Sequence, residues 1–250
     1  MAFKGCPGVE DSFSLTNTKG LLQSDVVCDE FGFCHAYASA EVVGAVYAYE
    51  QSLKTKTWPV THIPLSAQQL IDALPYNPEI GMVNDYIKNY GITTKSDYDN
   101  ARAINEELIN IHQMIRYRPS TVTNIKNSVD LKRELRRYPL VGVIDTASES
   151  LHHLKRHDIY ASNGIGDHAV ILTGYGTVRN QKCYEFKNSW GVEWACDGYG
   201  LVERDAVLSI WRPKEIQVVE PGGADWRFGR LVFWIAEEGG GLDYIVMLFR

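Results

Sequence analysis

The first half of the chain carries hydrophobic and small side chains at helical spacing. In residues 34–51 they recur every three or four positions, which predicts a helix with one buried stripe. The segments 66–74 and 81–90 repeat the pattern. Ser66 can cap the first of these two helices, and Gly91 ends the second.

The second half instead contains short runs of apolar and β-branched residues, which are typical of strands. These runs lie at 140–144, 169–173, 182–186 and 199–203. The polar turn 178–181 separates the second run from the third, so these two are expected to form a hairpin. Helices that precede strands predict an α+β fold of two lobes.

Changes of polarity mark where the chain divides. The stretch 118–127 is polar and is the expected crossing between the lobes, whereas 226–235 is rich in aromatic residues and could add an edge strand. We expect one domain over 1–250 with three parts: a mainly helical lobe (10–117), a mainly β lobe (118–220) and a C-terminal extension of unknown role (221–250).

Composition changes this picture little but argues against several classes of function. The 250 residues are 45% hydrophobic and 22% charged, as in ordinary globular domains. A net charge of −6 argues against nucleic-acid binding, which needs a clustered basic face. No apolar run reaches the roughly 20 residues of a membrane span, so no membrane partner is expected, and the start of the chain has no signal-peptide pattern.

The five cysteines are odd in number and scattered, with no Cys-x-x-Cys pair. A structural zinc site is therefore not expected, and we expect no other metal or cofactor. So few cysteines in a chain of this length indicate a reducing compartment, and together with the missing signal peptide they favour a cytoplasmic location. We expect a monomer.

Three residues form the candidate catalytic set. Cys34 begins the first predicted helix, where a helix N-terminus stabilises a thiolate. His168 stands at the entrance to a strand, and Asn188 follows the return strand of the same hairpin, so an amide oxygen could fix the imidazole tautomer. Taken singly, each residue is also compatible with a structural role, as a small buried residue, a polar strand residue or a turn residue.

Short motifs, in the right order, carry a resemblance to the papain family of cysteine peptidases. They are Lys19-Gly20, Cys28–Ala38, Leu65–Asp72, Tyr86–Ile92, Asp167–Val170 with Gly174–Gly176, and Lys187–Gly191 with Trp194 and Gly198-Tyr199. His168 and Asn188 follow Cys34 by 134 and 154 residues, close to the ~130–150 residues of that family. The resemblance covers most of the chain and implies a papain-like fold with a cleft between the lobes.

The resemblance implies a thiol endopeptidase. The Cys34 thiolate would attack a peptide carbonyl and form a thioester acyl-enzyme, while His168 protonates the leaving amine and later activates water. Asn188 would hold His168, and Trp190 would shield their hydrogen bond from solvent. Peptides or proteins are the expected substrates, and protein inhibitors are further expected partners.

The same resemblance assigns substrate-binding residues. Val143, Asp167 and Ala169 would line the pocket for the residue second from the scissile bond and favour an apolar side chain there, and Trp190 completes the set. The family is usually vacuolar, lysosomal or secreted, which differs from the cytoplasmic location that the cysteines favour.

Several positions depart from the family pattern. The oxyanion site would use the backbone N–H of Cys34 and a Gln side chain six residues earlier, where this chain has Cys28, a poor donor. Phe33 and His35 replace the Ser and Trp that flank the nucleophile, and Tyr76-Asn77 lies near the place of a substrate-binding Gly-Gly pair. The cysteines of the family disulfides are missing as well. These departures predict weakened activity.

Three functions therefore stay open: a weakened peptidase, a catalytically inactive papain fold that binds peptides or regulates, and acyl transfer other than proteolysis by the same residues. A reversible Cys28–Cys34 disulfide could silence the nucleophile, although two unconnected thiols are favoured because bridge geometry is strict. His152, His153 and His157 could ligate a metal, but a solvated loop is favoured because neighbouring cations would repel it.

Overall fold

The computed structural model describes most of the chain. The described residues are 2–3, 8–15, 26, 32–58, 61–104, 109–146, 148–162, 164–222, 231–236 and 242–247. None of the helices in these ranges is long and apolar enough to cross a membrane.

Helices and strands alternate irregularly along the chain. The helices are α1 (Cys34–Thr55), α2 (Ala67–Ala73), α3 (Ile80–Tyr90), α4 (Lys95–Ile104), α5 (Leu131–Leu135) and α6 (Glu149–His152), with 3₁₀ turns η2 (Ile111–Gln113) and η3 (Arg204–Ala206). The strands are β1 (Val9–Ser14), β2 (Ile92–Thr93), β3 (Arg116–Asn124), β4 (Leu140–Ile144), β5 (Ile159–Tyr160), β6 (His168–Val178), β7 (Gln181–Lys187), β8 (Tyr199–Glu203), β9 (Ser209–Val219), β10 (Leu231–Ala236) and β11 (Leu242–Met247).

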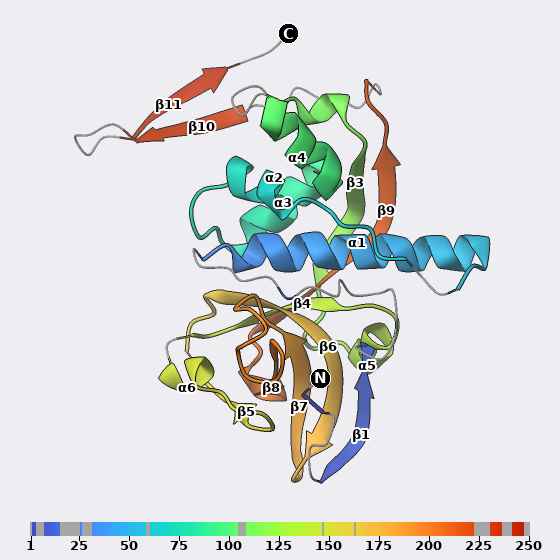
Figure 1. Ribbon diagram of the computed structural model, residues 1–250, viewed down its shortest axis with the longest axis vertical. Coiled ribbons are helices and arrows are strands. Elements are labelled where there is room, and N and C mark those ends of the chain that lie inside the picture. The colour runs from blue at the N-terminus through green and yellow to red at the C-terminus, as the bar shows by residue number, and fades with distance from the viewer. Residues whose placement is uncertain are drawn as a thin grey trace.

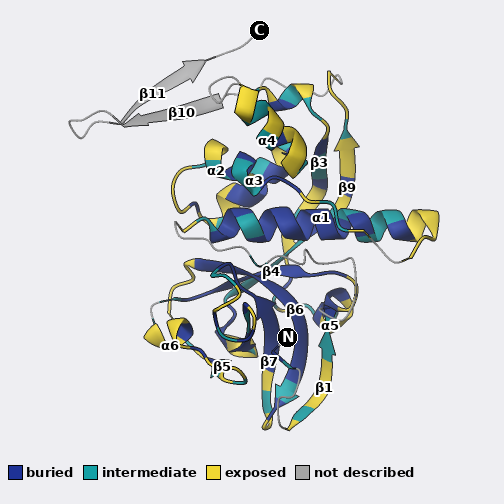
Figure 2. Ribbon diagram, viewed as in Figure 1, coloured by how far each residue is buried: buried dark blue, intermediate teal, exposed yellow. Residues whose placement is uncertain are grey.

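The long helix α1 lies across the middle of the molecule, between the helical lobe and the β lobe (Figure 1). Most of its residues from 34 to 48 are buried, not one stripe alone, so the prediction of a single buried stripe is wrong (Figure 2). The reason is that elements of both lobes cover the helix. Small residues permit this close approach, since a Cβ on Gly44 would lie 2.2 Å from the carbonyl oxygen of Ile63.

The helical lobe is formed by α2, α3 and α4 on one side of α1 (Figure 1). The Ser66 side chain caps α2 as predicted, accepting the N–H of Gln69 at 3.1 Å. The buried Gln69 amide then donates to the carbonyl of Gly91 at 2.9 Å and accepts the N–H of Thr93 at 2.8 Å. One side chain therefore ties α2 to the chain that follows α3.

One sheet runs through both lobes in the order β2-β3-β9-β4-β6-β7-β8-β5, with β1 paired to β6. Its pairings are antiparallel, apart from the parallel pair of β5 and β8. In the β lobe, Ile144, Leu172 and Phe186 from β4, β6 and β7 are among the largest fully buried side chains. The predicted α+β fold of two lobes is confirmed.

The predicted strands agree closely with the structure. β4 and β8 match the apolar runs at 140–144 and 199–203. β6 and β7 form the predicted hairpin, with Val178 opposite Gln181 at its turn. Both hairpin strands extend beyond the predicted runs, and β6 already begins at His168.

The polar segment 118–127 and the aromatic segment 226–235 both contribute to strands. Residues 118–124 of the expected crossing belong to β3, which pairs with β9 along most of its length. The expected edge strand at 226–235 lies partly in β10, but within the described residues β10 pairs with β11 alone, so the addition to the main sheet is wrong. Residues 226–230 lie outside the described ranges.

Candidate active site

The sulfur of Cys34 lies where the two lobes meet. Cys34 is the first residue of α1, and the dipole of this helix favours an anion there. The side chain is 3% exposed, and its sulfur accepts the backbone N–H of Ala169 in β6 at 3.3 Å. The start of α1 therefore rests on the start of β6, one residue from His168.

His168 and Asn188 come together because the β6–β7 hairpin brings its two open ends side by side. Nε2 of His168 lies 2.7 Å from Oδ1 of Asn188, and both side chains are buried. An amide oxygen only accepts, so Nε2 carries the proton, and Nδ1 is the ring atom that can exchange a proton with a thiol. Asn188 is itself fixed, since its N–H donates to Gly198 and its Oδ1 accepts the N–H of Ser189, both at 2.9 Å.

Trp190 lies between two histidines. Its ring is tilted by 30° against His168 at a centroid distance of 5.0 Å, and it stacks on His152 of α6 at 4.6 Å and 2°. Trp194 contacts its edge at 5.6 Å and donates its Nε1–H to the carbonyl of Leu151 in α6. The indole thus lies against the ring that Asn188 holds and is also in contact with His152 and Trp194.

His35 contacts the candidate nucleophile directly. Its Nδ1 lies 3.4 Å from the sulfur of Cys34, and its side chain is 4% exposed. Burial, helped by the nearby His168 and opposed by Asp167, lowers the pKa of His35 to about 4. The sequence analysis noted His35 only because it replaces the Trp of the family, and it did not predict the contact with Cys34. That replacement was the one signal in the sequence that could have pointed to the contact.

A buried ion pair joins α1 to β7 beneath these residues. Nζ of Lys187 lies 2.9 and 2.8 Å from the two carboxylate oxygens of Glu41, and the side chains are 2% and 6% exposed. Lys187 directly precedes Asn188, and Glu41 stands two turns after Cys34. The pair borders a cavity of about 20 Å³ lined by Cys34, Tyr37, Ala38, Glu41, Ala169, Val170, Ile171, Lys187, Asn188 and Ser189.

The expected substrate-binding residues gather near the start of β6. Val143 in β4 lies opposite Ala169 in β6, and both are buried. The exposed Asp167 accepts the N–H and the hydroxyl of Thr146, at 2.8 and 2.7 Å, and so fixes the loop after β4. Their role in substrate binding stays a prediction.

The helix start carries an aromatic pair that the sequence did not predict as a contact. Phe33 packs edge-to-face on the exposed Tyr76, with ring centroids 5.8 Å apart. A Cβ on Gly32, whose φ is +78°, would lie 3.2 Å from the Tyr76 hydroxyl. Cys28, the expected oxyanion position, and hence the proposed Cys28–Cys34 disulfide, lie outside the described residues.

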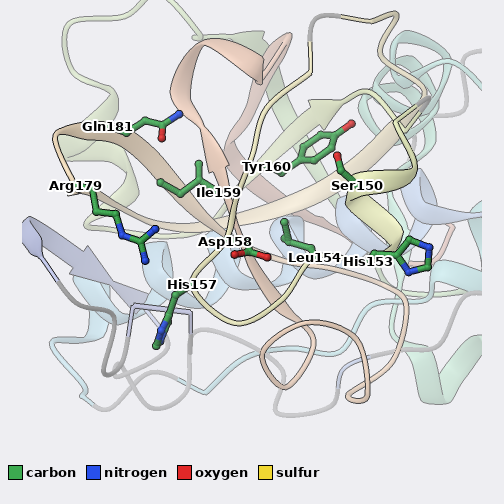
Figure 3. A pocket seen from close by; sticks show the side chains of 9 residues that line it. All are labelled: Ser150, His153, Leu154, His157, Asp158, Ile159, Tyr160, Arg179 and Gln181. Atoms are coloured by element: carbon green, nitrogen blue, oxygen red, sulfur yellow. The ribbon is translucent and has the colours of Figure 1, made fainter.

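The three histidines between positions 152 and 157 lie in different surroundings. His152 stacks on Trp190, whereas His153 and His157 line an open cavity of about 490 Å³ together with Arg179 (Figure 3). None of Cys34, His168 and Asn188 lines that cavity. Across the described ranges, the structure contains no cluster of three His, Cys, Asp or Glu side chains placed to hold a metal ion.

Comparison with known proteins agrees with this architecture. The family model "Papain family cysteine protease" matches residues 29–213. Cathepsin K of Mus musculus is 30% identical over 185 residues, covering 70% of this chain and 54% of the relative. Cysteine proteinase COT44 of Brassica napus is 27% identical over 186 residues, with the same coverage of 70% and 54%. The chain therefore spans about half the length of the curated relatives it matches.

Solved structures show the same fold. The digestive procathepsin L2 proteinase of Tenebrio molitor larval midgut superposes with a TM-score of 0.65 at 19% identity, covering 82% of this chain and 68% of the other. The bromelain protease of Ananas comosus, in complex with the E64 inhibitor, gives a TM-score of 0.58 at 20% identity and covers 82% and 99%. Since the family match extends from just before α1 into β9 and takes in both lobes, the chain belongs to the papain family of cysteine proteases.

Proposed function

We propose that the protein is a cysteine-type endopeptidase that uses Cys34, His168 and Asn188. The observation that carries the proposal is the position of the Cys34 sulfur, which lies at the N-terminus of α1 and accepts a hydrogen bond from the N–H of Ala169, next to His168. Asn188 in turn orients the His168 ring through a contact of 2.7 Å. A thiol at a helix N-terminus beside an imidazole is a favourable nucleophile. Family membership supports the same chemistry.

The reaction has two halves. The Cys34 thiolate attacks the scissile carbonyl carbon, and the His168 imidazolium gives its proton to the departing amine, leaving a thioester on Cys34. His168 then takes a proton from water as the water oxygen attacks the thioester, and Cys34 leaves as a thiolate. Asn188 keeps the ring in one tautomer and orientation through both halves.

The activity should be weak. The backbone N–H of Cys34, in the first turn of α1, is one expected donor to the oxyanion. The second donor position carries Cys28 in place of a Gln side chain. Because losing one oxyanion donor costs about 10²–10³-fold in rate, we expect turnover to be slow by a factor of that order.

Substrate selection should favour extended peptides with an apolar residue second from the scissile bond. Buried Val143 and Ala169, beside Asp167, form an apolar wall near His168. The Phe33–Tyr76 pair offers aromatic surface next to Cys34 instead of a glycine backbone. We therefore expect the protein to bind its substrate less through hydrogen bonds to the substrate backbone than through contacts with substrate side chains.

Labelling with the E64 inhibitor tests the proposal directly. We expect mass spectrometry to find the inhibitor on Cys34, no labelling in Cys34→Ala, and strongly slowed labelling and peptide hydrolysis in His168→Ala. His153→Ala, which changes an exposed histidine outside the site, is the matched control and should behave like wild type. An unlabelled Cys34 in the reduced protein at neutral pH would reject the proposal.

A second candidate is a papain fold that binds peptides without cleaving them. It is favoured by Cys28 at the oxyanion position and by the aromatic pair beside Cys34. In that case peptides bind with equal affinity to wild type and to Cys34→Ala, and wild type releases no product over hours. Any product that requires Cys34 decides for the peptidase.

A further inference from the structure

We propose that His35 is a second imidazole serving Cys34: as an uncharged ring it donates its Nδ1–H to the sulfur and stabilises the thiolate beside His168. The inference rests on the proposed function, since it concerns how the nucleophile is activated. It adds a residue that contacts the reacting sulfur to the three residues of the proposed mechanism.

Geometry places His35 on the sulfur itself. The Nδ1 to Sγ distance is 3.4 Å, and the two side chains are 4% and 3% exposed, so little water competes for this contact. On its other side the same sulfur accepts the N–H of Ala169 at 3.3 Å. The sulfur thus has N–H groups available from α1 and from β6, in addition to the helix N-terminus.

The charge state of His35 suits a donor and not a base. Its pKa lies near 4 because the ring is buried, and His168, at the start of β6, disfavours a second positive charge more than Asp167 favours it. At neutral pH the ring is therefore uncharged and carries one N–H. In the proposed mechanism the thiol proton moves to His168, which leaves His35 to stabilise the resulting anion.

Substitutions at position 35 can distinguish a chemical role of the His35 N–H from a purely steric role of its ring. A Phe side chain at position 35 fills buried space without an N–H, whereas an Asn side chain places an amide N–H close to where Nδ1 stands. A structural role predicts that the larger apolar ring replaces His35 better. A donor role predicts that the smaller amide does.

The test is the pH dependence of Cys34 alkylation by iodoacetamide, followed by mass spectrometry of the Cys34 peptide. One hydrogen bond to a charged group predicts that His35→Phe raises the apparent pKa of the thiol by about 1–2 pH units. His35→Asn should return it to within about half a unit of wild type. His62→Gln, which alters a half-buried histidine next to α1, should leave the profile unchanged.

Two results would overturn the inference: equal thiol pKa values in wild type, His35→Phe and His35→Asn, or a lower value in His35→Phe, which would mean that Nδ1 accepts from the thiol. Should His35→Phe fail to fold, ¹⁵N NMR of the histidine rings in wild type decides instead. We expect a proton on Nδ1 of His35, and an unprotonated Nδ1 would reject the donor role.

The same experiment distinguishes this inference from the proposed function. A wild-type Cys34 that titrates near the ordinary thiol value of about 8.5 would reject the activated nucleophile and thus the peptidase. A depressed wild-type value that does not respond to the residue at position 35 would leave the peptidase standing and reject the role of His35 alone.

Discussion

The Glu41–Lys187 ion pair allows a direct test of how α1 is held to the β lobe. Its side chains are 6% and 2% exposed, and Nζ lies 2.8 and 2.9 Å from the carboxylate oxygens. Lys187→Met leaves the Glu41 charge buried without its counter-charge, which costs about 3–5 kcal/mol. At about 2–4 °C per kcal/mol for a chain of this size, the melting temperature should fall by about 6–20 °C.

Two further variants show whether the loss comes from the charge. Replacing both partners, in Glu41→Leu/Lys187→Met, removes the buried charges together and should recover most of the stability, because apolar replacement of a whole buried pair is often neutral. Lys95→Met, which breaks the exposed Lys95–Asp99 pair, should cost at most about 1 kcal/mol.

Scanning calorimetry of these variants, together with the single variant Glu41→Leu, gives the coupling free energy by a double-mutant cycle. Peptide hydrolysis measured beside it should fall in Lys187→Met even well below the melting temperature, because Lys187 directly precedes Asn188. The reasoning is refuted if Lys187→Met melts within about 2 °C of wild type, or if the double variant is no more stable than the single one.

Changes at three other positions test the electrostatics and packing of the site. Between pH 6.5 and about 4, His35 is protonated in the unfolded chain but not in the folded protein, so acidification lowers the unfolding free energy by about 3 kcal/mol. Urea titrations of His35→Phe should lack this contribution, whereas the contribution of half-buried His62, whose pKa is also lowered by burial, should remain. Cys28→Gln should raise kcat/KM for peptides by up to about 10²–10³-fold, and an unchanged value would mean that the oxyanion donor does not limit the rate. His152→Ala removes the ring stacked on Trp190 and should cost about 0.5–1.5 kcal/mol in thermal unfolding, whereas no change relative to wild type would show that the stack is not stabilising.

The elements that could be predicted are those whose own sequence contains the whole signal. β4 and β8 are short apolar runs that are buried as single units, and Ser66 caps a helix through a bond only three residues long. β3 and β9 gave no such signal, because their residues are largely polar or half-exposed and are held in place by pairing with each other. That pairing joins segments nearly a hundred residues apart, which local patterns do not register.

The contacts of the candidate site likewise divide into those that the sequence could predict and those that it could not. The positions of His168 and Asn188 at the two ends of one hairpin follow from strand pairing, so their contact could be anticipated. In the sequence, Glu41 and Lys187 look like ordinary charged residues. Their neighbours give no sign that the two are buried and neutralise each other, because they lie 146 positions apart. The contact of His35 with its neighbour depends on a rotamer that burial selects, which no spacing rule expresses.

The groups that act on the Cys34 sulfur come from both lobes, and this makes thiol reactivity a property of the whole fold. The helix N-terminus and His35 belong to α1, whereas the N–H of Ala169 belongs to β6. A shift of α1 along the sheet would remove the β6 donor and the nearby His168 together, while leaving the α1 donors in place. In the proposed mechanism the thiolate is therefore stabilised fully only when α1 is docked. A shift of α1 would separate the buried charges of Glu41 and Lys187, so this pair should stabilise the reactive form of the sulfur as well as the fold.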